Sequence, residues 1–160
     1  LHDIKKAPLE ERLAIAKEQG FLCGHLALSK VISEYPVDDG ALTPGYAMYL
    51  KNLFAKNDLD IAVLGCYLNL ANPNEEQLAK ITHRYMAHIR FASLLGVGVV
   101  GTETGAVNEE YKFEEKNHSD EALVIFIQNV KPVISYAEKM GVIFVYHIKK
   151  IAYCQEKCHS

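Results

Sequence analysis

The sequence predicts an α/β fold built on a parallel sheet, and two observations support this prediction. Segments with helical periodicity alternate with short apolar runs of strand length, four times in succession. The apolar runs are nearly continuous, as expected for strands that are covered on both faces. Such regular alternation favours right-handed crossovers between parallel neighbours. The 160 residues, 49% of them hydrophobic and 23% charged, suffice for one domain with a single core.

The first helix is expected to begin at Pro8, because proline suits the first helical position. Leu9 and Leu13 follow at helical spacing and belong to the stripe that would be buried. Gly20 is expected to end this helix, since glycine readily adopts the left-handed conformation that terminates helices. The apolar run of residues 21–28 then predicts the first strand.

A loop rich in proline, aspartate and glycine covers residues 36–40 and leads to the second helix. Thr43 is the expected cap of this helix, and Pro44 its first residue. The helical pattern continues to Lys56. Residues 60–68 form a nearly continuous apolar run, which predicts the second strand.

The third helix has the clearest pattern in the chain. Asn72 is expected to cap it, Pro73 to take its first position and Gly96 to end it. Its apolar residues recur at helical intervals and comprise Leu78, Ile81, Tyr85, Ile89, Ala92 and Leu95.

Residues 97–102 predict the third strand, and the polar stretch of residues 103–120 predicts a surface loop over one end of the sheet. Ser119 is expected to cap the last helix, which Gly141 closes. The apolar stripe of this helix is expected to comprise Leu123, Ile127, Val130, Ile134, Ala137 and Met140.

The last strand begins at Val142, and residues 146–160 are expected to form an irregular tail. Within that tail, Cys154, Cys158 and His159 are residue types that zinc prefers. A structural zinc site needs four ligands, usually from two separated pairs, so we expect no metal there.

Two architectures are compatible with this order of elements: an open, flavodoxin-like sheet and part of a (β/α)₈ barrel. Periodicity alone does not separate them. A glycine-rich phosphate-binding turn after the first strand would favour the open sheet, and Leu28–Lys30 contains no glycine.

Composition narrows the range of partners and compartments. The formal net charge is −3, and Lys and Arg are scattered among acidic residues, so we expect no nucleic acid partner. Apolar runs stay below the roughly 18 residues of a membrane helix, and the first residues lack the apolar segment of a secretion signal. We therefore expect a soluble, cytoplasmic protein with no membrane partner.

Three segments, Ala27–Lys30, Leu64–Pro73 and Val99–Gly105, together resemble the sugar phosphate isomerase/epimerase family, whose members have the xylose isomerase-like barrel. The resemblance extends to about Phe144. It implies a partial (β/α)₈ TIM barrel of four to five parallel strands with alternating helices. Residues 1–160 would then form a single incomplete domain, corresponding to the N-terminal half of the barrel with its first strand clipped.

The resemblance also implies a divalent metal, such as manganese or cobalt, at the carboxyl ends of strands five to eight. Two Glu, one Asp and one His would hold it, and the first ligand would lie in a Glu-Pro pair that closes strand five. The chain reads Val142–His147 at that place and has no such pair. We therefore expect no metal and no cofactor in this chain, catalytic residues that stay unknown, and no catalytic competence of the chain by itself.

Two residues are predicted to contact a sugar or sugar phosphate. Glu103 follows the third strand, and Asn69 follows the second, so both are expected at the carboxyl face where barrel substrates bind. The alternative for both is a local hydrogen bond to the backbone of a turn. His25 lies within the first strand and is expected to be neutral and bonded to a polar neighbour, and His2 is expected to be frayed.

Two alternative functions remain open at this point. A half barrel exposes two strand edges and an apolar inner face, so the chain could be a non-catalytic assembly or binding module that forms a homo-oligomer through those edges. A nuclease similar to endonuclease IV would need several histidine ligands at strand ends three and four, where Tyr67, Asn69 and Glu103 stand instead.

Overall fold

A single parallel sheet organises the chain, which we describe from a computed structural model over residues 1–112 and 114–147. Its strands, in spatial as well as chain order, are β1 (Cys23–Ala27), β2 (Asp60–Gly65), β3 (Val99–Glu103) and β4 (Ile143–His147). Every neighbouring pair is parallel. Because the order never reverses, the open flavodoxin-like alternative is wrong and the partial (β/α)₈ barrel is confirmed.

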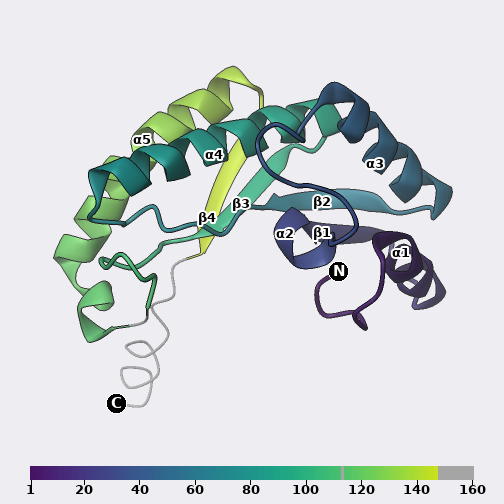
Figure 1. Cartoon of the computed structure of the whole chain (residues 1–160), viewed down its shortest axis with the longest axis horizontal. Coiled ribbons are helices and arrows are strands. Elements are labelled where there is room, and N and C mark those ends of the chain that lie inside the picture. The colour runs from purple at the N-terminus through teal and green to yellow at the C-terminus, as the bar shows by residue number, and fades with distance from the viewer. Residues whose placement is uncertain (113, 148–160) are drawn as a thin grey trace, which may run out of the picture.

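Helices connect the strands and cover one face of the sheet (Figure 1). The long ones are α1 (Leu9–Glu18), α3 (Pro44–Lys56), α4 (Glu75–Leu95) and α5 (Asp120–Lys139). Two short ones, α2 (Leu28–Val31) and the 3₁₀ helix η1 (Glu115–His118), lie in the connections and were not predicted. None of the helices in residues 1–112 and 114–147 is long and apolar enough to cross a lipid bilayer.

Helix ends follow the predicted capping residues at two of three places. The Thr43 hydroxyl accepts a hydrogen bond from the Tyr46 amide at 3.2 Å, and the Ser119 hydroxyl accepts one from the Ala122 amide at 3.1 Å. The predicted start of α4 is wrong by two residues. Asn74 caps that helix, because Asn72 instead accepts a hydrogen bond from the Asn74 amide and shapes the preceding loop.

The buried stripe of α5 differs from the predicted one. Leu123 and Ile127 are 37% and 40% exposed, whereas Phe126 is 1% exposed and packs its ring against Tyr146 at 5.1 Å between centroids. Apolar residues occur on more than one side of this helix, so periodicity alone did not select the packed side. The buried residues are Ala122, Phe126, Val130, Val133 and Ala137.

Two segment boundaries also differ from the predictions. Within the stretch predicted to be a surface loop, Ala106 and Asn108 are buried. β4 continues to His147, two residues into the predicted irregular tail. The rest of that tail, with Cys154, Cys158 and His159, lies outside the described residues.

Register divides the sheet into two chemically different faces. Paired residues of parallel strands point to the same side, so the row formed by Leu26, Leu64, Val100 and Phe144 lies under the helices. Leu64 and Val100 are fully buried there. The adjacent row, which comprises Ala27, Gly65, Gly101 and Val145, belongs to the other side, which we call the open face. Helices of the described segments do not cover it, and Ile143 on this face is 64% exposed.

The hydroxyl of Tyr85 joins α4 to the carboxyl ends of β2 and β3. Tyr85 is fully buried. Its oxygen lies 3.0 Å from the Cys66 carbonyl, 2.8 Å from the Leu68 carbonyl, 3.0 Å from the Leu68 amide and 2.5 Å from the Thr102 hydroxyl. Burial raises the pKa of this phenol well above its usual value, so it stays protonated. β2 ends at Gly65, earlier than predicted, where the chain turns toward this hydroxyl.

We predict that Tyr85→Phe lowers the free energy of unfolding by about 1–3 kcal/mol, because it leaves buried carbonyl and amide groups without their partner. Urea denaturation measures this loss. Tyr136→Phe is the control, since Tyr136 packs against the same core while its hydroxyl has no hydrogen-bond partner among the described residues. Equal stability of the two variants would contradict the role assigned to Tyr85.

Candidate functional site

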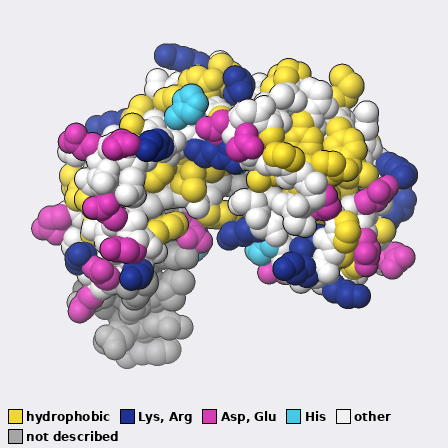
Figure 2. Space-filling model, in the orientation of Figure 1, with side chains coloured by type: hydrophobic (Ala, Val, Ile, Leu, Met, Phe, Trp, Pro, Cys, Tyr) yellow, Lys and Arg dark blue, Asp and Glu magenta, His cyan; other side chains and the backbone are white. Residues whose placement is uncertain are grey.

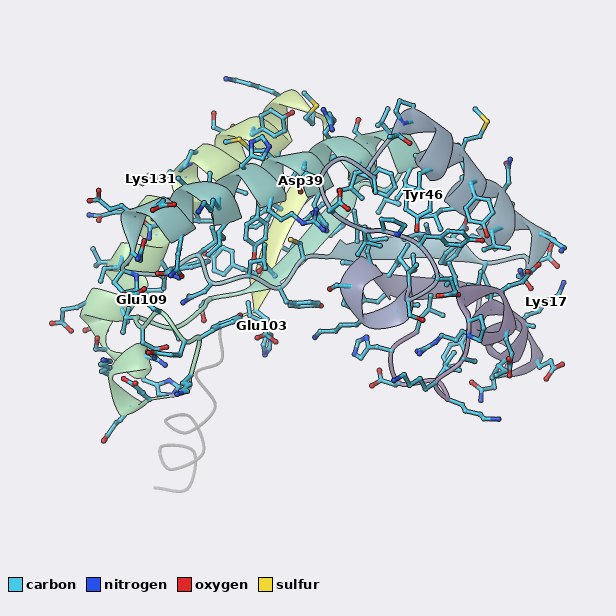
Figure 3. The ribbon with its side chains drawn as sticks, viewed as in Figure 1. Lys17, Asp39, Tyr46, Glu103, Glu109 and Lys131 are labelled. Atoms are coloured by element: carbon cyan, nitrogen blue, oxygen red, sulfur yellow. The ribbon has the colours of Figure 1, made fainter. Side chains whose placement is uncertain are left out.

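Polar side chains gather where the strands of the sheet end. His25 belongs to β1, Tyr67 follows β2 by two residues, and Glu103 and His147 are the last residues of β3 and β4. Glu103 and His147 are register partners, so both belong to the same face of the sheet. Figure 3 shows Glu103 at the carboxyl end of β3. This is the end at which (β/α)₈ barrels place their functional groups.

His25 and Tyr67 form a hydrogen-bonded pair on the open face. The Tyr67 hydroxyl lies 2.9 Å from Nε2 of His25. The absence of a side chain at Gly65 makes room for the pair, because a Cβ there would lie 2.3 Å from His25 Nε2 and 2.9 Å from Tyr67 Cε2. The expectation that His25 has a polar partner is therefore confirmed.

Electrostatics link Glu103 to two phenols. Burial raises the pKa of Tyr67, and the charge of Glu103 raises it further. The same two causes, in the same order, raise the pKa of Tyr111 to about 12. Both phenols therefore stay protonated at neutral pH and can donate hydrogen bonds. Burial, followed by the charge of His2, lowers the pKa of His25, so the imidazole is neutral at pH 7.

A hollow of about 450 Å³ lies beside these groups. This volume falls within the range of roughly 300–1,000 Å³ that is typical of small-molecule sites. Its lining comprises Val63, Tyr67, Gly101, Thr102, Glu103, Val145, Tyr146 and His147. Glu103 also borders a smaller hollow of about 90 Å³ with Tyr111 and His118. The carboxylate therefore stands between two concave regions of the surface.

Asn69 holds two loops together. Its side chain is 4% exposed and donates to the Asn108 carbonyl at 2.8 Å, while its Oδ1 accepts from the amides of Ala71 at 3.2 Å and Ala106 at 2.8 Å. These bonds tie the loop after β2 to the loop that begins next to Glu103. Contact of Asn69 or Glu103 with a ligand stays a prediction. The hydrogen bonds show that Asn69 positions the loop that begins next to Glu103.

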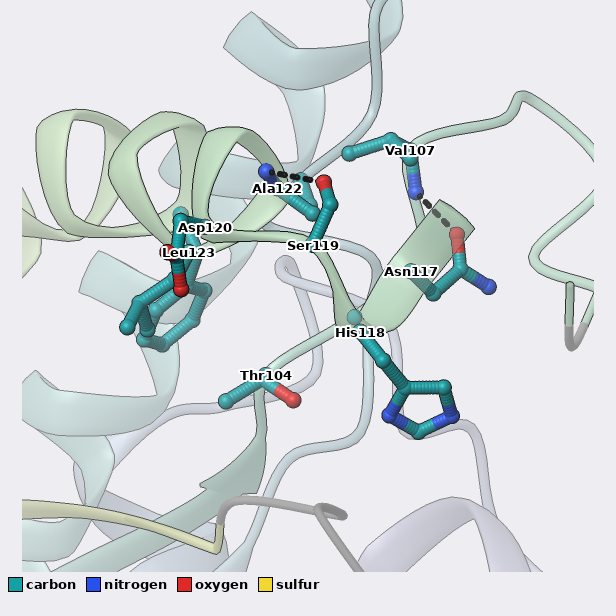
Figure 4. A pocket seen from close by; sticks show the side chains of 11 residues that line it. Thr104, Val107, Asn117, His118, Ser119, Asp120, Ala122 and Leu123 are labelled. Atoms are coloured by element: carbon teal, nitrogen blue, oxygen red, sulfur yellow. Dashed lines mark hydrogen bonds between the residues drawn. The ribbon is translucent and has the colours of Figure 1, made fainter. Parts of the chain in front are cut away.

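A further pocket lies between that loop and the beginning of α5 (Figure 4). The Asn117 side chain accepts a hydrogen bond from the Val107 amide at 3.0 Å and so fixes one of its walls. The volume is only about 40 Å³. This is room for one or a few water molecules and too little for a sugar.

Tyr67 and His147 were not predicted as site residues. The sequence does carry a sign of Tyr67. Side chains alternate between the two faces of a strand, and Tyr67 lies two residues beyond Gly65, so it belongs to the same face of the sheet as Gly65. The sequence places His147 in an irregular tail and does not indicate its pairing with Glu103, which the structure shows. His2 lies with its ring centroid 5.7 Å from that of His25. Leu1–Ile4 form a turn beside β1 rather than the end of a strand.

Residues 1–112 and 114–147 do not fit a divalent metal. In this part of the chain, no three side chains of His, Cys, Asp or Glu come together in a group that could hold an ion. The end of β4 carries Tyr146 and His147, and it has no carboxylate where the family resemblance implies the first ligand. We therefore derive no chemical step through a metal.

We predict that Gly105→Ala destabilises the loop that carries Glu103. Gly105 has a φ of +89°, and a Cβ would lie 2.6 Å from Asn69 Oδ1. The matched control is Gly141→Ala, which has a φ of +67° and no atom within 4 Å of the added Cβ. We expect Gly105→Ala to cost about 1–3 kcal/mol more than the control in urea unfolding, because it adds a clash to the backbone strain. Equal costs would show that the contact with Asn69 is not tight.

Comparisons with known proteins agree with this geometry. The chain matches the xylose isomerase-like TIM barrel family over residues 13–155. A putative xylose isomerase from Rhodospirillum rubrum superposes with a TM-score of 0.64 at 15% identity, over 91% of this chain and 50% of that one. D-psicose 3-epimerase from Clostridium cellulolyticum, crystallised with D-tagatose, superposes with a TM-score of 0.60 at 17% identity, over 86% and 46%. At these identities the superpositions show the fold alone.

The chain spans about half the length of these two solved structures. No curated protein matches it in sequence. The family match covers most of the chain, and the four parallel strands with their outer helices have the architecture that the family name describes. This chain therefore belongs to the xylose isomerase-like TIM barrel family.

Proposed function

We propose that this chain forms the substrate-binding wall of a sugar or sugar phosphate isomerase or epimerase. The observation that carries the proposal is the position of Glu103, whose carboxylate lines a hollow of about 450 Å³ together with Tyr67 and His147. Family membership supports the proposal, as does the location of the hollow at the carboxyl ends of the strands.

The lining of the hollow suits a polyhydroxylated ligand. The Glu103 carboxylate can accept hydrogen bonds from sugar hydroxyls, and the Tyr67 phenol oxygen, which keeps a lone pair beside its bond to His25, can accept another. Val63 and Val145 present methyl groups to the same hollow, and these can pack against the C–H groups of a sugar. Asn69 contributes indirectly, because it holds the loop that follows Glu103.

Binding, rather than complete catalysis, is the role that we propose for the described residues. Isomerisation of a hydroxy-ketone moves a proton between adjacent carbons and needs a positioned base and acid. Glu103 is the only carboxylate among the described residues that line the larger hollow. A divalent metal such as manganese or cobalt, implied by the family resemblance, would need ligands beyond those that the described residues bring together.

We predict that the chain binds ketohexoses and that Glu103→Gln weakens this binding by at least about tenfold, because a hydrogen bond to a charged acceptor is replaced by one to a neutral amide. Calorimetric titration with D-tagatose and D-fructose measures the affinity. Glu110→Gln is the control, since Glu110 is an exposed carboxylate on the same loop. Absence of binding, or equal binding by both variants, would refute the proposal.

A second candidate function is a non-catalytic module that assembles with a copy of itself. The observation that favours it is the apolar part of the open face on β4, where Ile143 and Val145 are 64% and 42% exposed. β1 and β4 are the edge strands of the described sheet, and edge strands are where a further strand can pair. Two open faces packed together would remove this apolar surface from water.

We predict that the chain dimerises at high concentration and that Val145→Lys shifts it toward monomer, since a buried charge without a partner disfavours such an interface. Sedimentation velocity measures the shift. The control is Leu94→Lys on α4, because Leu94 is 43% exposed and thus matched to Val145 at 42%. A strict monomer, or an equal effect of both substitutions, would count against assembly through the open face.

A further inference from the structure

Basic and titratable side chains surround the β1 side of the candidate site. His25 comes from β1, Lys30 from α2 and His2 from the segment before α1. The Lys30 ammonium lies 4.2 Å from the centroid of the Tyr67 ring. The rings of His2 and His25 are 5.7 Å apart between centroids. We call His2, His25 and Lys30 the basic cluster.

Tyr67 connects this cluster to the hollow. Its hydroxyl bonds to His25, its ring lies beneath Lys30, and its side chain lines the hollow together with Glu103. A ligand in the hollow that contacts Tyr67 is therefore next to the basic cluster. Figure 2 shows that charges of both signs alternate over the molecule's visible face, so the cluster is not part of a broad basic surface there.

Positive charge in the cluster is only partly compensated. After burial, which is the largest cause, the charges of His2 and Lys30 lower the pKa of His25, and the charge of Asp3 acts in the opposite direction. Asp3 lies 3.5 Å from His2 Nε2, and its side chain is 90% exposed. Water screens such an exposed carboxylate strongly, so it neutralises the cluster weakly.

We propose that the basic cluster binds an anionic substituent, phosphate or carboxylate, of the sugar ligand. The inference rests on the proposed function and deepens it by naming the substrate class. Lysine is a common phosphate binder that acts as a compact charge. An imidazole beside it becomes a second donor once the anion favours its protonated form.

The charges also give the ligand a direction across the sheet. Glu103 at the end of β3 repels an anion, whereas the basic cluster at the end of β1 attracts it. Two strand spacings separate the two ends, or about 10 Å. An extended sugar phosphate bridges a distance of this order, with its hydroxyl groups toward Glu103 and its anionic group toward Lys30.

The test compares three ligands by calorimetric titration at pH 7: D-fructose 6-phosphate, D-glucuronate and D-fructose. We expect at least one of the two anionic ligands to bind tenfold or more tightly than D-fructose, and the stronger of the two identifies the anion. Lys30→Gln should reduce that advantage, measured against D-fructose binding by the same variant, to less than threefold. The control is Lys6→Gln, because Lys6 is an exposed lysine outside the cluster and its loss changes the net charge equally.

Proton uptake provides an independent readout. Titrations in two buffers of different ionisation enthalpy should show that a proton is taken up from the buffer when the anionic ligand binds near pH 7. His25→Gln should reduce this uptake, because His25 is the group expected to gain the proton. Binding of all three ligands with equal affinity would overturn the anionic subsite while the proposed function stands. Binding of none would refute the proposed function itself. An advantage that survives Lys30→Gln would also overturn the subsite.

Discussion

Paired residues of parallel strands point to the same side of a sheet, and this constraint determines where every strand side chain of the chain lies. One row carries large aliphatic and aromatic residues, such as Leu64 and Val100, and the helices pack on it. The adjacent row is built from small residues, of which Gly65 and Gly101 are paired. The same pairing that buries the core therefore leaves a row of small residues on the open face.

The candidate site lies on this row of small residues. Side chains from neighbouring segments can meet there, as His25 and Tyr67 do over Gly65. Glu103 reaches the same side one row farther along, so a carboxylate, a phenol and an imidazole follow one another across neighbouring strands. The charges on the two sides of the candidate site follow from the order of the strands, with Glu103 lining the hollow at the end of β3 and the basic cluster on the β1 side, beyond Tyr67. The proposed orientation of an anionic sugar depends on this order.

Local sequence signals predicted the elements well where a single residue decides the outcome. Thr43 and Ser119 cap their helices as predicted, and Glu103 lies at the strand end where it was expected. Prediction failed where two similar choices compete. Asn72 and Asn74 are both good capping residues, and Asn74 caps the helix because Asn72 already accepts a local hydrogen bond from the Asn74 amide. The packed side of α5 is decided by contact with the sheet, as between Phe126 and Tyr146.

The candidate site could be predicted only in part, for a related physical reason. A residue at the end of a strand is visible in the sequence, but its partners come from other strands, as Tyr67 does for His25. Asn69 illustrates the point, because its three hydrogen bonds reach as far as Asn108 along the chain. Those bonds hold together the loop after β2 and the loop that begins next to Glu103. A displacement of the segment next to Glu103 would therefore have to stretch or break the bonds that fasten it to the loop after β2.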